Sequence, residues 1–135
     1  MVDSLDPSRR SWNMGRIKGK NTRPEIAVRS LLHSMGFRFR LHRRDLPGTP
    51  DIVLPKYRTA IFINGCFWHR HPGCKYAYTP KSRTEFWEKK FKGTTQRDAS
   101  NRKLLMDLGW KVETIWECEL RNIEQLREKI EKIRG

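Results

Sequence analysis

The sequence has few cysteines and no long apolar segment. Its three cysteines are an odd number, and no apolar stretch near the N-terminus resembles a secretory signal, which argues against a disulfide-rich secreted protein. No stretch approaches the roughly 18 apolar residues of a membrane span, and the mean hydropathy is −0.81. We therefore expect a cytoplasmic protein that spans no membrane.

Acidic side chains are also scarce. The 135 residues include 15 Asp and Glu against 29 Lys and Arg, for a net charge of +14. Such an excess indicates a polyanionic partner. Arg10, Arg16 and other basic residues lie in a segment with little apolar content, so we expect residues 1–20 to form a flexible basic DNA-binding arm. A solvated tail is the alternative. We expect residues 21–135 to form a single, monomeric domain.

The apolar pattern alternates between helical and strand periods. Thr22, Pro24 and Glu25 form a capping motif at a helix start, and Gly36 is suited to end that helix. Gly93 is a weak point between two further helical stretches. The expected helices cover residues 22–36, 84–92, 95–108 and 122–133, and the expected strands cover residues 37–41, 52–54, 59–63 and 110–116. This order predicts an α/β domain with a mixed central sheet flanked by helices.

The cysteines are placed for metal binding. Cys66, His71 and Cys74 fall within nine residues, and Cys118 follows the last expected strand. Three thiolates and one imidazole are a common tetrahedral zinc set, and four protein ligands indicate a structural site. Buried reduced cysteines with a surface histidine are the alternative. Because the loop lacks apolar periodicity, a metal would supply the stability that a core otherwise gives.

Three further side chains have the chemistry of a nuclease site. Asp51 follows Pro50 at the entry to an expected strand, where many nucleases place a magnesium ligand, although Asp after Pro is also common in turns. Glu25 is a capping residue, which is compatible with a second role. His69 lies close to the cysteine-containing loop and is a candidate general base, with a purely structural histidine as the alternative.

Phe67 and Trp68 are adjacent aromatics in a polar, glycine-containing loop. Such a pair usually belongs to a core. In a protein this basic, exposed aromatics can instead wedge between bases or stack on them. Both interpretations remain open from the residues alone.

These residues form a recognisable set. The string Phe62-Ile-Asn-Gly-Cys-Phe-Trp-His69 occurs with Arg10-Ser11-x-Asn13-Met14, Leu46-Pro-Gly-x-Pro-Asp51, Arg83-Thr-Glu-Phe-Trp87, Arg97-Asp98 and Trp116-Glu-Cys118. With these motifs in order along the chain, the sequence resembles the very short patch repair (Vsr) DNA mismatch endonucleases, from about residue 9 to residue 121.

The resemblance implies a zinc-bearing variant of the restriction-endonuclease-like, PD-(D/E)xK fold. It also implies a magnesium-dependent nick in duplex DNA, 5′ of the thymine in T:G mismatches that arise from deamination of 5-methylcytosine. Asp51 would bind Mg²⁺ by its carboxylate and Ile63 by its backbone carbonyl. His69 would activate water, Glu25 would help to hold water at the metal, and Asp98 would orient His69.

Further roles carry over from the same family. The implied zinc ligands are Cys66, His71, Cys74 and Cys118; the implied intercalating residues are Met14, Phe67 and Trp68; and the implied DNA contacts are Arg10, Arg16, Lys90, Thr94 and Arg97. The implied partners are double-stranded DNA with a T:G mismatch and mismatch-repair proteins such as MutL. A bacterial, nucleoid-associated location follows from the same resemblance.

The sequence departs from the family pattern at several points. The usual Glu-x-Lys of restriction endonucleases reads Ile63-Asn64-Gly65 here, so the second strand offers no carboxylate or lysine. Asn64 replaces an expected histidine, Thr94 replaces an expected longer amide, and the metal loop is one residue longer. We therefore expect the flanking-sequence preference to differ.

Two other functions fit part of this pattern. A non-catalytic DNA-binding module with a structural zinc accounts for the charge and the cysteines, but it needs no convergent acid and imidazole. A related nuclease that cuts both strands, or that lacks mismatch preference, accounts for all the residues, and only substrate assays separate it from a mismatch nickase.

Overall fold

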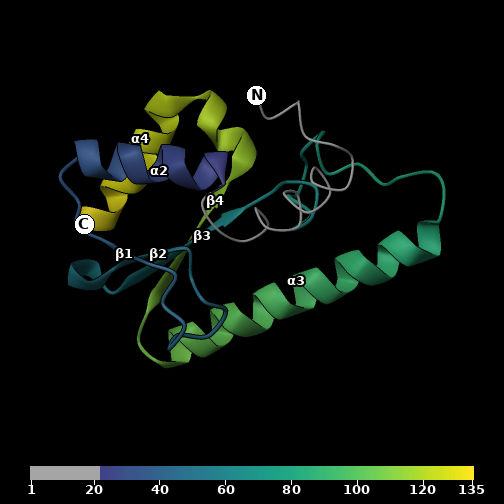
Figure 1. The fold of residues 1–135 in the computed structure, drawn as a ribbon, viewed down its shortest axis with the longest axis horizontal. Coiled ribbons are helices and arrows are strands. Elements are labelled where there is room, and N and C mark those ends of the chain that lie inside the picture. Colours follow the sequence, from purple (N-terminus) through teal and green to yellow (C-terminus); the bar gives the residue numbers. More distant parts are fainter. Residues whose placement is uncertain (1–21) are drawn as a thin grey trace, which may run out of the picture.

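The computed structural model describes residues 22–135, and the expected basic arm with Arg10, Met14 and Arg16 lies outside the described residues. This part of the chain forms four strands and three α-helices (Figure 1). In order, they are α2 (Arg23–Ser34), β1 (Arg40–Leu41), β2 (Ile52–Leu54), β3 (Thr59–Asn64), α3 (Thr84–Asp107), β4 (Lys111–Trp116) and α4 (Ile123–Glu131). Short 3₁₀ helices cover Pro55–Tyr57, Glu117–Arg121 and Lys132–Arg134.

The sheet is mixed, as the sequence predicts. Its strand order is β1-β2-β3-β4, with antiparallel pairs β1–β2 and β2–β3 and a parallel pair β3–β4. The first strand is shorter than the expected 37–41, because only Arg40 and Leu41 pair with β2. Pro55 begins a 3₁₀ helix directly after β2, so residues 37 and 38 have no strand partner in this register, and Phe37 is buried in the core instead.

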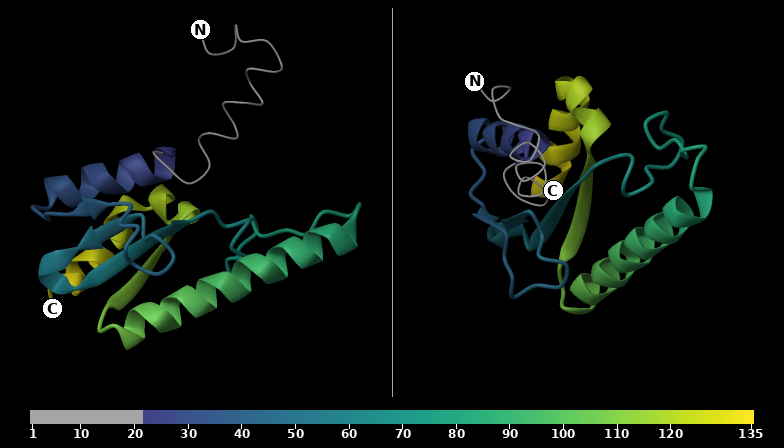
Figure 2. Two further views of the ribbon diagram at one scale, coloured as in Figure 1. Left: turned by 60° about the horizontal axis from the view of Figure 1, so that its bottom comes forward. Right: turned by 45° about the vertical axis from the view of Figure 1, so that its right-hand side comes forward.

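Helices cover both faces of the sheet, so the fold has three layers. Alternate strand residues supply two separate cores. Ile52, Ile61 and Ile115 face α2 and α4, whereas Val53 and Ala60 face α3. In Figures 1 and 2, α2 and α4 lie together on one side of the sheet and α3 lies on the other. The predicted α/β class with a mixed sheet flanked by helices is confirmed.

Helix α3 is continuous, so the expected break at Gly93 does not occur. One glycine costs a helix only about 1 kcal/mol relative to alanine, and the helix is anchored by the buried Phe91 before Gly93 and by the buried Leu105 near its C-terminal end. The N-terminal half of α3 extends beyond the sheet toward the loop of residues 65–83 (Figure 2). The helix therefore joins the sheet to that loop.

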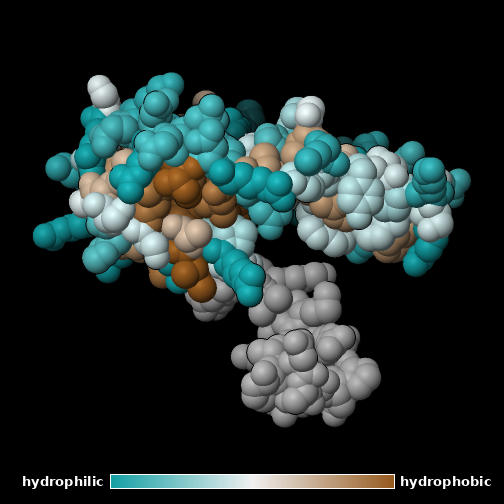
Figure 3. All heavy atoms as spheres, turned by 90° about the horizontal axis from the view of Figure 1, so that it is seen from above, coloured by the Kyte–Doolittle hydropathy of each residue, from teal (hydrophilic) through white to brown (hydrophobic). Residues whose placement is uncertain are grey.

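The surface above α2 and α4 is largely hydrophilic, with apolar surface gathered over part of it (Figure 3). No helix within residues 22–135 is long and apolar enough to cross a membrane.

Candidate functional site

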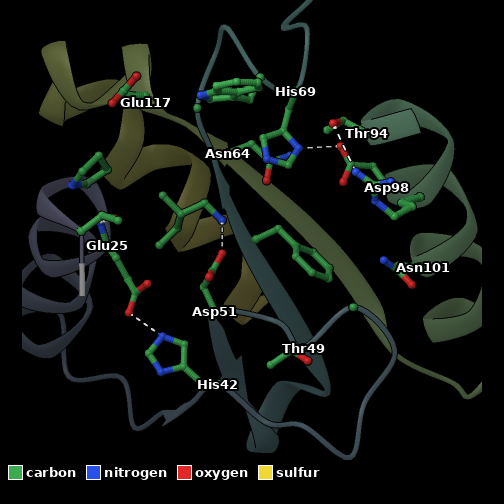
Figure 4. A pocket seen from close by; sticks show the side chains of 18 of the residues that line it. Glu25, His42, Thr49, Asp51, Asn64, His69, Thr94, Asp98, Asn101 and Glu117 are labelled. Carbon is green, nitrogen blue, oxygen red and sulfur yellow. Dashed lines mark hydrogen bonds and ion pairs between the residues drawn. The ribbon is translucent and has the colours of Figure 1, made fainter. Parts of the chain in front are cut away.

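A cleft of about 680 Å³ lies between the start of α2, the end of β3 and the middle of α3. Figure 4 shows its side chains pointing inward from these elements. The cleft brings together most of the residues predicted to act on DNA, namely Glu25, Asp51, Ile63, Trp68, His69, Thr94, Arg97 and Asp98. Residues distant in sequence therefore share one site.

Glu25 enters the cleft from the first turn of α2. The Thr22 side chain caps this helix by accepting a hydrogen bond from the Glu25 N–H at 3.3 Å. The Glu25 carboxylate does not close the other half of the expected capping box. It is 2% exposed and pairs instead with Arg29 and with His42, whose Nε2 lies 2.7 Å from Glu25 Oε2. Capping by Thr22 thus leaves the carboxylate available to the site.

Asp51 lies immediately before β2, and its carboxylate reaches across to β3. Its Oδ2 accepts a hydrogen bond from the backbone N–H of Ile63 at 2.8 Å. Because N–H and C=O of one strand residue point to the same side, the Ile63 carbonyl faces the Asp51 side as well. Burial raises the pKa of Asp51, although the Ile63 hydrogen bond and nearby cationic side chains oppose the rise. A bound cation would favour the ionised carboxylate.

His69 follows the end of β3 in the cleft wall. Its backbone N–H donates to the Gly65 carbonyl, and its Nδ1 lies 2.6 Å from Asp98 Oδ2 on α3. A carboxylate at Nδ1 favours the tautomer with the proton on that nitrogen, which leaves Nε2 as a proton acceptor. The arrangement has the form of an oriented general base.

His42 is a site residue that sequence reasoning missed. Its backbone has a positive φ of 47°, which is uncommon outside glycine, and its N–H donates to the Asp51 carbonyl at 3.2 Å. One ligand atom each from Glu25, His42 and Asp51 lies within 4.8 Å of the other two. Carboxylate and imidazole donors at this separation fit a divalent cation. A lone histidine after a short strand carries no spacing signal, so only the fold could reveal it.

The predicted zinc ligands also come together. One ligand atom each from Cys66, His71, Cys74 and Cys118 lies within 4.8 Å of the others, and His71 Nδ1 lies 3.4 Å from Cys118 Sγ. Tetrahedral zinc with Zn–S bonds of about 2.3 Å separates its sulfur ligands by roughly 3.8 Å, so this donor set fits zinc. The Trp116 ring stacks on His71 with 4.3 Å between centroids, which fixes the imidazole.

Burial raises the pKa of the Cys66 thiol to about 12. A thiolate in this position therefore needs a cation to offset the loss of hydration, and a coordinating thiol is deprotonated by the metal that binds it. The cysteines carry no disulfide among the described residues.

Arg70 organises the loop around the cysteines, which the sequence analysis did not anticipate. Its guanidinium donates to the carbonyls of Phe67, Ala77 and Tyr78, at 3.3, 2.8 and 2.9 Å. It also lies over the Phe91 ring at 3.9 Å. One side chain therefore satisfies several loop carbonyls and joins the loop to α3.

The aromatic pair divides between two environments. Phe67 is half-buried and contacts the rings of Trp68, Tyr78, Trp87 and Phe91, with centroids 5.1 to 5.5 Å apart. Trp68 is 41% exposed and lines the cleft. Phe67 is therefore mainly a core residue of this aromatic cluster, whereas Trp68 presents its ring to the cleft.

The middle of α3 forms the other cleft wall. Thr94, Arg97 and Asp98 line it, and Arg97 lies 3.5 Å from the Thr94 hydroxyl. Lys90 is exposed one turn earlier and does not line the cleft. Opposite this wall, Gly48 lies so close to Asn101 that an added Cβ would meet its side chain at 2.9 Å. The Leu46-Pro-Gly loop thus closes on α3.

Comparison with known proteins identifies the family. A sequence model of the DNA mismatch endonuclease Vsr matches residues 2–75. The chain belongs to the Vsr family. It is 50% identical over 133 residues to the type II nicking enzyme V.XorIIP of Xanthomonas oryzae pv. oryzae, covering 98% of this chain and 97% of that protein. It is 42% identical to the DNA mismatch endonuclease Vsr of Escherichia coli K12, covering 96% of this chain and 82% of that protein.

A solved structure shares this fold. The catalytic domain of the homing endonuclease I-Bth0305I superposes with a TM-score of 0.59 and 22% identity, covering 84% of this chain and 94% of that domain. This likeness concerns the fold alone. Membership in the Vsr family confirms the predicted resemblance and the prediction of a DNA endonuclease.

Proposed function

We propose that this chain nicks one strand of duplex DNA on the 5′ side of the thymine in a T:G mismatch, with the help of a divalent cation. The observation that carries the proposal is the convergence of Glu25, Asp51 and the His69–Asp98 pair in one cleft. A module that only binds DNA has no need for acid and imidazole groups at one point. The family membership supports the same reaction class.

Each cleft residue has a defined part in the reaction. Asp51 and the Ile63 carbonyl would hold Mg²⁺, and when bound the cation supplies positive charge that neutralises the reacting phosphate. Glu25 supplies a further carboxylate for water or for the cation. His69 takes a proton from the attacking water at Nε2, while Asp98 keeps the Nδ1 proton in place and stabilises the resulting imidazolium.

The remaining roles concern structure and recognition. Cys66, His71, Cys74 and Cys118 would hold a structural zinc that fixes the loop carrying Trp68. Trp68 stacks against a base beside the mismatch, with Phe67 supporting it from the aromatic cluster and Met14 joining from the arm. The basic arm and α3 contact phosphates. Recruitment of mismatch-repair proteins such as MutL stays an expectation from the family.

Mismatch selectivity has a physical basis in this arrangement. A mismatched pair is easier to unstack than a Watson–Crick pair, so inserting an aromatic side chain beside it costs less free energy. Thr94 and Arg97 lie where they can contact flanking nucleotides, and Thr94 has a shorter side chain than the amide expected in the family. This difference supports a flanking preference particular to this chain.

The test compares binding and cleavage on matched duplexes. Zinc-loaded protein is mixed with end-labelled T:G, U:G, T:A and C:G duplexes, with and without Mg²⁺, and both strands are followed. The proposal predicts a single nick in the thymine strand of T:G that requires the cation. Binding without any cleavage would favour the DNA-binding module, and equal cleavage of T:A would favour a nuclease without mismatch preference.

A further inference from the structure

We propose that His42 is a nitrogen ligand of the catalytic cation, so that the site combines carboxylates, a carbonyl and an imidazole. The inference rests on the proposed function in one respect, namely that a divalent cation binds at Asp51. It adds a ligand that the motifs of the sequence do not contain, and it predicts which metals the site prefers.

The backbone fixes His42 beside the metal-binding carboxylate. The His42 N–H donates to the Asp51 carbonyl at 3.2 Å, and the positive φ of 47° at His42 turns the chain at that point. Figure 4 shows the Glu25 carboxylate and the His42 ring directed at each other, with Asp51 beside them at the same end of the cleft.

The hydrogen-bond pattern leaves oxygen lone pairs for a cation. His42 and Arg29 both pair with Glu25 through Oε2, and no described residue forms a hydrogen bond with Glu25 Oε1. Asp51 uses Oδ2 for the Ile63 N–H. A cation among these groups would take the His42 Nε2 lone pair, while Arg29 continues to neutralise Glu25 Oε2. The cluster is compact enough for this exchange, since its ligand atoms lie within 4.8 Å.

An imidazole ligand changes the metal preference. Mg²⁺ prefers six oxygen ligands, whereas transition metals gain more than Mg²⁺ from a nitrogen donor. The site should therefore bind Mn²⁺ more tightly than Mg²⁺ by a larger margin than an all-oxygen site would. If His42 served only as a hydrogen-bond donor to Glu25, its replacement would lower the affinities for Mn²⁺ and Mg²⁺ by the same factor.

The experiment uses Mn²⁺ as the probe on the full zinc-loaded chain. Pulsed electron paramagnetic resonance detects the ¹⁴N modulation of an imidazole bound directly to Mn²⁺. We compare wild type with His42→Asn, which retains a residue tolerant of positive φ, with His69→Gln, and with His33→Gln as a control at an exposed histidine on α2. The expected ¹⁴N modulation is present in wild type, His69→Gln and His33→Gln, and absent in His42→Asn.

The metal affinities give a second readout. His42→Asn should reduce the Mn²⁺ affinity by about tenfold or more, the loss found when groups that support a metal site are removed, and the Mg²⁺ affinity by a smaller factor, so the ratio of the two affinities should fall. Nitrogen modulation that persists in His42→Asn, or an unchanged affinity ratio, would overturn the inference. If His42→Asn does not fold, His69→Gln labelled with ¹⁵N-histidine provides the test. His33 and His71 do not line the cleft, so in this variant a ¹⁵N signal from a ligand of Mn²⁺ could come only from His42.

Asp51→Asn separates this inference from the proposed function. If Asp51→Asn retains full Mn²⁺ binding, the cation site of the proposed function is wrong. If Asp51→Asn abolishes Mn²⁺ binding but His42→Asn leaves the nitrogen signal unchanged, only the role of His42 is wrong.

Discussion

The Asp51 carboxylate accepts a hydrogen bond from the backbone N–H of Ile63 at 2.8 Å, across the entry to β2 and the end of β3. This contact aligns a side-chain oxygen with a backbone carbonyl that faces the same side. Under the proposed function, the strand would contribute its main chain to the cation site, so the usual Glu-x-Lys of the second strand would not be needed. The apolar side chain of Ile63 is compatible with that role.

The first prediction concerns the stability cost of Asp51. Burial raises the pKa of Asp51 in the folded state. The protonated carboxyl therefore contributes stability to the fold below its unfolded pKa of about 3.9. That contribution is lost as the pH rises through the folded-state pKa. At neutral pH without divalent cation, Asp51→Asn should therefore raise the melting temperature while abolishing Mg²⁺-dependent nicking. The gain should shrink toward pH 4, as measured by thermal denaturation.

Asp45→Asn is the matched control for that prediction. Asp45 is exposed, and its hydrogen bond with Arg43 lowers the pKa of the carboxyl, so its stabilising contribution is present at neutral pH. Asp45→Asn should not raise the melting temperature. A lower melting temperature for Asp51→Asn at pH 7 without Mg²⁺ would contradict the argument.

A second prediction concerns the His69–Asp98 pair. His69→Gln should slow single-turnover nicking by about 10²- to 10⁴-fold, the usual contribution of a general base, with little change in DNA affinity. Asp98→Asn should cause a smaller loss, because it disturbs the orientation of His69 rather than removing the base. Asp107→Asn, an exposed position near the end of the same helix, should react at the wild-type rate. Normal rates in both His69→Gln and Asp98→Asn would place the base elsewhere.

Zinc removal gives a third prediction. Wild type should contain about one zinc per chain, and Cys118→Ser should lower zinc content and melting temperature together, because metal binding and folding of the loop are coupled. Lys75→Ala, an exposed position in the same loop, should change neither quantity. The check is metal analysis with thermal denaturation, and a stable chain free of zinc would show that the cysteines are merely buried thiols.

The two neighbouring aromatics should respond differently to truncation. Trp68→Ala should weaken T:G binding by about ten- to a hundredfold, as expected for a lost base stack of about 1–3 kcal/mol, with unchanged zinc content. Phe67→Ala should also lower the melting temperature, because Phe67 packs among four other rings. A 2-aminopurine beside the mismatch should brighten with wild type and less with Trp68→Ala. Loss of fold in Trp68→Ala, with normal selectivity in Trp68→Phe, would assign Trp68 to the core.

The sequence predicts the parts of this protein that depend on local pattern. The zinc ligands have a recognisable spacing, and the apolar runs at Ile52–Leu54 and Thr59–Asn64 form adjacent strands as expected. The sequence pattern mispredicts the structure where tertiary contacts determine the local conformation. Gly93 does not break α3, because contacts at Phe91 and Leu105 hold both sides of it. Glu25 pairs with Arg29 and His42 instead of completing its helix cap. The i+4 spacing on α2 indicates Arg29 as a partner, whereas His42, 17 residues away, could not be chosen from spacing.

The central claim is strand-specific cleavage at a mismatch. The most direct measurement maps the nick on a T:G duplex labelled separately on each strand, with Mg²⁺ and zinc-loaded wild-type protein. We expect one cut in the thymine strand, at the phosphodiester bond 5′ of the thymine, and an intact guanine strand and T:A duplex. Equal cutting of both strands, or of T:G and T:A alike, would contradict it.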